Sequence, residues 1–457
     1  MKCAVILATL LAGACAPALA PRPAGALVTP PAEWRTNTAA QGAIDAQWWA
    51  RFGDPVLSAL VERARTNNTD LAIAAARVAE ARGQEAVARS LLMPTLSASA
   101  PGSEARSVNA FGRPSESLSA QPVFQAAYEV DLFGANAARV DAARSGLAAV
   151  EAARESATLS VSAATASSYV TLLALDARRT LLQATLLSRN EALRIARDRA
   201  RAGYTSQLEY QQAEAEYRSA EQQIPAIEAA IARQENALSL LTGEMPYAIA
   251  RGGSFDQLAT PVVPAVLPSE LVRRRPDIAQ SEYALAASDA NLRVARAQFL
   301  PQVKLGASAG AVFSSLLPDP ITIWSLGGSV LAPLFQGGRL TGQFNAATAQ
   351  RDQAAYAYRK TVLTAFREVE DQLAVIDRLD VQERSLLAQR AAVAEVLRHA
   401  TNRYRAGYSP YLEQIDAQRA LLGVDLALIQ LRTDKLTARV ALYQALGGGS
   451  EPSVPKR

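Results

Sequence analysis

The chain has 457 residues, of which 49% are hydrophobic but only 6% aromatic. Its 47 Lys and Arg and 43 Asp and Glu are interspersed, so there is no basic stripe to neutralise phosphates, and nucleic acid is excluded as a partner. The cysteines, Cys3 and Cys15, lie near the start, and His399 is the single histidine. This inventory argues against an enzyme and predicts no cofactor and no metal site.

The N-terminus has the pattern of a secretory signal. Lys2 precedes an apolar run over residues 4–12, and we assign residues 1–15 to a signal peptide that is removed. The run Leu11-Ala12-Gly13-Ala14-Cys15 resembles a bacterial lipobox, which predicts lipidation of Cys15. Ordinary cleavage a few residues later is the alternative. No later stretch of about 18 apolar residues is evident, so a membrane crossing would have to use strands.

The sequence repeats itself. Asp70-Leu71-Ala72 aligns with Asp277-Ile278-Ala279, and Arg201-Ala202-Gly203-Tyr204 recurs 204 residues later as Arg405-Ala406-Gly407-Tyr408. Two halves therefore share one plan. We assign a first repeat to residues 40–268, including a Pro- and Gly-rich equatorial linker at 243–268, a second repeat to residues 269–447, and a disordered tail to residues 448–457.

Each repeat contains a pair of predicted strands, at about 95–133 and 301–333. Apolar and polar residues alternate over 303–313 and 124–132, a period of two that gives a strand one apolar face. The segments 95–100 and 321–331 are less regular, and Gly327-Gly328 predicts a bulge or bend. A loop rich in Gly, Ser and Pro joins the strands of each pair.

A long helical hairpin follows each strand pair, at about 134–242 and 336–446. Residues 135–201 contain no proline, and their apolar residues recur at steps of mostly three, four or seven, as in coiled coils. Gly203 and Gly407 are expected to end the first helix of each hairpin at a tight tip. Ser206 with Glu209 then predicts a capping box, and Ser409-Pro410 an N-cap followed by a first-turn proline.

Four strands with an apolar face cannot close a barrel by themselves. An open edge in lipid would leave backbone groups unpaired at a cost of several kcal/mol each. Two or three copies would supply eight or twelve strands, within the range of outer-membrane barrels. The sequence therefore favours an oligomeric tube in an outer membrane.

Several sequence blocks form a recognisable set. They are Trp48-Trp49 with Asp54-Pro55, Leu267-Pro268-Ser269-Glu270-Leu271, Arg274-Arg275-Pro276-Asp277-Ile278, Phe335-Gln336-Gly337-Gly338-Arg339-Leu340 and Ala365-Phe366-Arg367-Glu368-Val369. This set resembles the TolC-type outer-membrane efflux factors, specifically the NodT/OprM lipoprotein branch. Together the blocks span almost the whole mature chain.

The resemblance implies a mainly α-helical fold with a small transmembrane β part: a homotrimer with a 12-stranded β-barrel on a 12-helix periplasmic α-barrel. It implies a passive duct that contacts outer-membrane lipid, a periplasmic adaptor and an inner-membrane transporter of the resistance-nodulation-division class. Its cargo would be small molecules such as drugs. A duct for type I protein secretion and a coiled-coil surface scaffold without a pore are the alternatives.

The resemblance also implies a periplasmic gate at the second-repeat tip. Leu412 and Asp416 would form the constriction, and Arg403, Tyr404 and Arg405 could hold it shut. Glu413 is acidic in both repeats, matching Glu209. Gln212 aligns with Asp416 and Leu208 with Leu412 in the first-repeat tip. A ring of three Asp416 carboxylates would attract cations.

Overall fold

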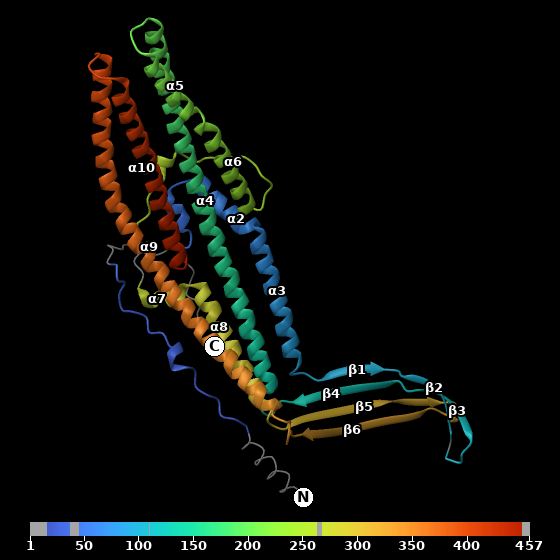
Figure 1. The fold of residues 1–457 in the computed structure, drawn as a ribbon. Helices are drawn as coiled ribbons and strands as arrows, with labels where there is room; N and C mark the ends of the chain where they lie inside the picture. Colours follow the sequence, from blue (N-terminus) through green and yellow to red (C-terminus); the bar gives the residue numbers. More distant parts are fainter. Residues whose placement is uncertain (1–15, 37–44, 109, 263–266, 450–457) are drawn as a thin grey trace. The chain divides into compact units, whose positions relative to one another are not determined.

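The computed structural model describes residues 16–36, 45–108, 110–262 and 267–449 (Figure 1). The chain forms two compact units. Unit 1 is built from residues within 1–28, 76–152 and 280–360, and unit 2 from residues within 29–75, 153–279 and 361–457. Helix is the main structure, at 66%. The predicted signal peptide with Cys15, and residues 450–457 of the predicted tail, lie outside the described residues.

Unit 1 contains an antiparallel sheet in the order β1-β4-β5-β6, formed by β1 Thr95–Ser99, β4 Val123–Val130, β5 Gln302–Ser314 and β6 Ile321–Leu331 (Figure 1). All four predicted strands are present. The strands of the two repeats meet where β4 pairs with β5, from Val130↔Val303 to Val123↔Gly310. A Cβ at Gly310 would come within 2.2 Å of the Pro122 carbonyl oxygen, so this pairing requires glycine.

Two sequence predictions about the sheet were incomplete or wrong. The loop of the first repeat is itself a hairpin, β2 Gly102–Val108 with β3 Pro114–Ala120, whose end pairs with β5 at Ser119↔Ser314. Its serine-rich sequence lacks apolar alternation, so periodicity did not reveal it. Gly327-Gly328 is not a bulge, because β6 pairs one-to-one with β5 through both glycines.

The helices of unit 1 are residues 76–90 of α3 Thr69–Ser90, residues 135–152 of α4 Ala135–Arg201, residues 280–297 of α8 Pro276–Ala297 and residues 339–360 of α9 Arg339–Arg405. Small apolar clusters hold α8 to α9, such as Leu292, Ala295 and Phe344. The N-terminal segment, residues 16–28, includes the short helix η2 Ala24–Ala26 and lies against the same pair. There Arg351 donates to the carbonyl oxygen of Ala20 at 3.0 Å.

Unit 2 contains the far ends of α4 and α9 and the helices that return from them. The first return is broken into α5 Gln207–Glu221 and α6 Gln223–Leu241, whereas the sequence predicted one continuous helix. Pro225 explains the break, because its ring clashes with the carbonyl of residue 221 and it has no N–H to donate to that carbonyl. The second return, α10 Tyr411–Ala445, contains no proline and is continuous over 35 residues.

The helix starts at the two tips differ. The Ser206 side chain accepts from the Glu209 N–H at 3.3 Å, which confirms the predicted N-cap of α5. At the second tip the prediction was wrong: α10 begins at Tyr411, Pro410 occupies the N-cap position, and no side chain caps the helix. The proline therefore lies one residue before the helix, in extended conformation.

The broad end of unit 2 has an aromatic and charged core, to which η3 Trp48–Phe52, α2 Pro55–Asn67, η4 Phe255–Gln257 and α7 Pro268–Arg274 contribute. Trp48 is fully buried and stacks on Tyr443, with ring centroids 5.3 Å apart. Buried Arg275 bonds Asp277, Glu368 and the Ala445 carbonyl at 2.6–2.9 Å. Two sequence blocks that carry the family resemblance thus meet at one guanidinium.

Among the described helices, α4 is long and apolar enough by composition to cross a membrane. This differs from the sequence prediction that no such stretch follows the signal. Of its most apolar window, 56% is buried within the protein. The apolar residues of α4 therefore serve helix packing.

Candidate functional site

The two hairpin tips have the same backbone design. Gly203 and Gly407 adopt left-handed conformations, with φ of 75° and 79°. In each tip the following tyrosine donates its N–H five residues back, Tyr204 to Arg199 and Tyr408 to Arg403, both at 2.9 Å. This is the Schellman arrangement, which satisfies helix-terminal carbonyls and reverses the chain within a few residues.

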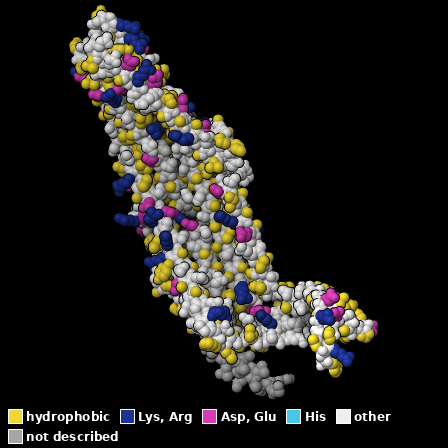
Figure 2. Space-filling model, turned by 45° about the vertical axis from the view of Figure 1, so that its right-hand side comes forward, with side chains coloured by type: hydrophobic (Ala, Val, Ile, Leu, Met, Phe, Trp, Pro, Cys, Tyr) yellow, Lys and Arg dark blue, Asp and Glu magenta, His cyan; other side chains and the backbone are white. Residues whose placement is uncertain are grey.

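The predicted gate residues lie together around the second tip but are not all in contact. An Arg403 Nη1 lies 3.5 Å from Glu413 Oε2 across the hairpin. The Asp416 carboxylate is 64% exposed and lies 3.6 Å from Arg419 of the same helix. Leu412 and Arg405 are exposed. Charged side chains of both signs gather at this end of unit 2 (Figure 2).

Tyr404 packs inward and does not bond to Asp416 in this structure. Its ring lies 5.1 Å from that of Tyr411, and the Arg199 guanidinium lies 5.3 Å from the Tyr404 ring. Burial, with the nearby charge of Glu209, raises the pKa of Tyr404. Burial also raises the pKa of Tyr411 to about 12. Both hydroxyls are therefore neutral at physiological pH.

The two hairpins meet beneath the tips in a mixed cluster. Leu193 and Ala196 of α4, Ala213 of α5, and Tyr411 and Ile415 of α10 form its buried part. In the first-repeat tip, Leu208 is exposed and Gln212 partly exposed. The apolar cluster holds the hairpins side by side and leaves the tip residues accessible.

Sequence reasoning missed a charged group directly below this cluster. Glu216 of α5 is buried between Arg189 of α4 and Arg419 of α10. The Arg189 Nη1–Glu216 Oε2 distance is 3.0 Å, and Arg419 Nε donates to Glu216 Oε1 at 2.8 Å. A comparison of the repeats contained a usable signal, because neither Arg189 nor Glu216 has a charged counterpart in the second repeat.

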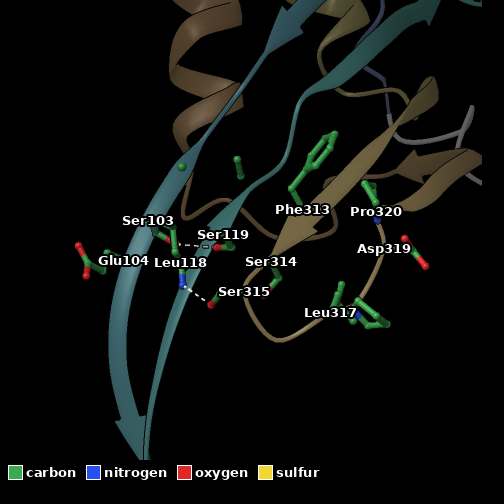
Figure 3. Close-up of a pocket in the computed structure, with 13 residues that line it drawn as sticks. Ser103, Glu104, Leu118, Ser119, Phe313, Ser314, Ser315, Leu317, Asp319 and Pro320 are labelled. Atoms are coloured by element: carbon green, nitrogen blue, oxygen red, sulfur yellow. Dashed lines mark hydrogen bonds between the residues drawn. The ribbon is translucent and has the colours of Figure 1, made fainter.

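Unit 1 contains a separate cavity of about 690 Å³ between the β2–β3 hairpin and the β5–β6 loop (Figure 3). Its walls include Leu118, Phe313 and Leu317, and a hydrogen bond from the Leu118 N–H to the Ser315 hydroxyl closes one side at 3.0 Å. The carboxyl groups of Glu104 and Asp319 also line it, but no histidine or cysteine is among its lining residues. The tips of unit 2 are the better candidate site.

Comparison with known proteins identifies the class. The family model for outer membrane efflux proteins matches residues 60–244 and 267–448. The pyoverdine export outer membrane protein OpmQ of Pseudomonas aeruginosa is 35% identical over 97% of this chain and 96% of its own. The toluene efflux pump outer membrane protein TtgC of Pseudomonas putida is 33% identical, over 95% and 90%. The Campylobacter jejuni CmeC channel superposes with a TM-score of 0.88 at 25% identity, covering 96% of both chains.

The fold and these matches define an outer-membrane transport channel. The chain belongs to the outer membrane efflux protein family. It is the outer-membrane channel of a tripartite efflux system, as the sequence predicted.

Proposed function

We propose that three copies of the chain close one continuous channel, with twelve strands around the upper part and twelve helices around the lower part. The two edges of the sheet support this assembly. Among the described residues, β1 pairs only with β4 and β6 only with β5, so each has a free edge. In lipid those edges require partners, and a second copy supplies a β1 for each β6.

The gate of this channel lies at the second-repeat tip. The exposed carboxylate of Asp416 and the exposed side chain of Leu412 are available to line a constriction around a threefold axis. Arg403, Tyr404, Arg405 and Glu413 support the same hairpin. The first-repeat tip, with Gly203, Leu208 and Gln212, and the glycine turn at Gly407 complete the closing end.

Conductance of the purified protein in planar bilayers tests this proposal. We expect the combined changes Asp416→Ala, Tyr404→Phe and Arg405→Ser to raise single-channel conductance severalfold, because they remove the carboxylate ring and its supports. Asp434→Ala, farther along α10, is the matched control and should leave conductance at the wild-type value. Unchanged conductance in the triple variant would refute the gate, and a lack of any threefold, pore-forming particle would refute the channel.

The cargo we propose is small molecules, delivered by a periplasmic adaptor and an inner-membrane transporter of the resistance-nodulation-division class. The relatives named for pyoverdine and toluene support small-molecule export over the type I protein secretion alternative. Deletion of the gene should sensitise its host to efflux substrates and leave secreted protein levels unchanged. Loss of a secreted protein with normal drug tolerance would favour the alternative.

We also propose that Cys15 carries lipid. The described chain starts one residue later, and the carbonyl oxygen of Pro17 accepts a hydrogen bond from Arg296 at 3.1 Å. Arg296 lies in the last turn of α8, shortly before β5 begins at Gln302. This position supports a lipid anchor at the level where the strands enter the bilayer.

A further inference from the structure

Four charged residues lie where the two hairpins meet, two from each repeat, and each has an uncharged equivalent in the other repeat. Arg189 and Glu216 belong to the first hairpin, and Asp416 and Arg419 to the second. At the repeat spacing of 204 residues, uncharged residues occupy every equivalent position. These equivalents are Val393 for Arg189, Ala420 for Glu216, Gln212 for Asp416 and Ala215 for Arg419. If these charges served only to solvate the helix tips, they would not need to differ between the two repeats in this way.

Glu216 is the fixed centre of the group. Its side chain is 9% exposed, and that of its partner Arg189 is 4% exposed. A carboxylate buried to this extent requires a paired cation and cannot readily move to solvent. The buried Arg189–Glu216 pair therefore joins α4 to α5 within the first hairpin.

Arg419 is the exposed member of the group. Its side chain is 59% exposed, yet Nε and Nη2 both bond to Glu216 Oε1, and Nη1 lies 3.6 Å from Asp416 Oδ1. A guanidinium has five donors in a planar fork and can contact two carboxylates with different nitrogens. Arg419 thus connects the exposed carboxylate proposed for the gate to the buried carboxylate of the neighbouring hairpin.

We propose that Arg419 is a latch: it holds the second hairpin to the first through Glu216 while partly neutralising Asp416, and the channel opens when the Arg419–Glu216 contact breaks. The inference rests on the gate proposed above and names a residue that positions it. In the closed state the latch reduces repulsion among the three Asp416 side chains. Once Arg419 leaves Glu216, the second hairpin is free to move away from the axis.

The test compares three variants of the full-length trimer in planar bilayers. Arg419→Gln removes the charge, while Arg419→Lys keeps the charge but presents one nitrogen in place of a fork. The control is Arg390→Gln, which breaks an exposed ion pair to Asp425 at 2.5 Å, between α9 and α10 of the same hairpin. Asp416→Asn is recorded alongside, and thermal stability of the trimer is measured for all variants.

We expect Arg419→Gln to raise the open probability at least fivefold, Arg419→Lys to give an intermediate value, and Arg390→Gln to match the wild type, all with unchanged thermal stability. Wild-type gating in Arg419→Gln, with altered gating in Asp416→Asn, would overturn the latch but keep the gate. Wild-type gating in both would overturn the gate as well. If Arg419→Gln does not assemble, Arg419→Lys decides: wild-type gating in it refutes the latch.

Discussion

Tyr411 illustrates how a single residue at the tip can be tested by its titration. Its side chain is 2% exposed, and burial raises its pKa from the ordinary 10 to about 12. Between pH 10 and 12 an unfolded chain would lose this proton while the folded chain keeps it. The contribution of this retained proton to the free energy of unfolding is therefore fully present below pH 10. It is lost as the pH rises toward 12, which lowers the stability by about 3 kcal/mol at most.

The prediction is that Tyr411→Phe removes one tyrosine equivalent from the absorbance rise at 295 nm near pH 12. The same variant should lose less stability than the wild type between pH 10 and 12, since its unfolded state no longer gains from ionisation. Thermal melts at pH 9, 10, 11 and 12 measure this. Loss of this tyrosine equivalent near pH 10 instead of pH 12 would contradict the burial seen here.

At the scale of the element, the tip glycines adopt a left-handed backbone conformation that a glycine inside a helix does not. Gly407 has φ of 79° in the turn, whereas Gly423 lies inside α10 without a positive φ. An added Cβ meets nothing within 4 Å at either position. Any difference between the two substitutions therefore arises from backbone conformation.

We expect Gly407→Ala to destabilise the protein by about 1–2 kcal/mol, the cost of a left-handed alanine. Gly423→Ala should stabilise it by about 0.5–1 kcal/mol, because alanine is the better helix former. Denaturant melts give the free energies, and hydrogen exchange at residues 403–411 locates the first effect. Equal effects at both sites would show that the tip does not need its left-handed turn.

At the scale of the whole molecule, two features are proposed to hold the chain in the outer membrane, its strands and a lipid on Cys15. If the strands suffice for assembly, Cys15→Ala should abolish incorporation of labelled palmitate but leave a membrane-inserted trimer. Metabolic labelling and membrane fractionation measure the two results separately. Palmitate retained in Cys15→Ala would exclude this cysteine as the attachment site, and soluble protein would show that the strands need the anchor.

The sequence alone determined the duplicated plan, the four main strands, the long first helix of each hairpin and the tight glycine turns. Each of these features follows from residues that are close together in the sequence. The signals are a hydrophobic period of two for strands or near three and a half for helices, an absence of proline, and a glycine at a helix end. The same local rules wrongly predicted Ser409 as the N-cap of α10 and Pro410 as its first-turn residue. They also did not predict the break that Pro225 causes between α5 and α6. They also missed the β2–β3 hairpin, whose serines carry no apolar period.

Only the tertiary structure decided which charges meet. Arg189, Glu216 and Arg419 are far apart in the chain, and no local pattern distinguishes them from the many charged residues of solvated helix faces. Packing of the two hairpins buries one carboxylate, and burial makes a paired cation obligatory there. Arg275 is similar: its motif was visible in the sequence, but its partners Glu368 and Ala445 are supplied by the fold.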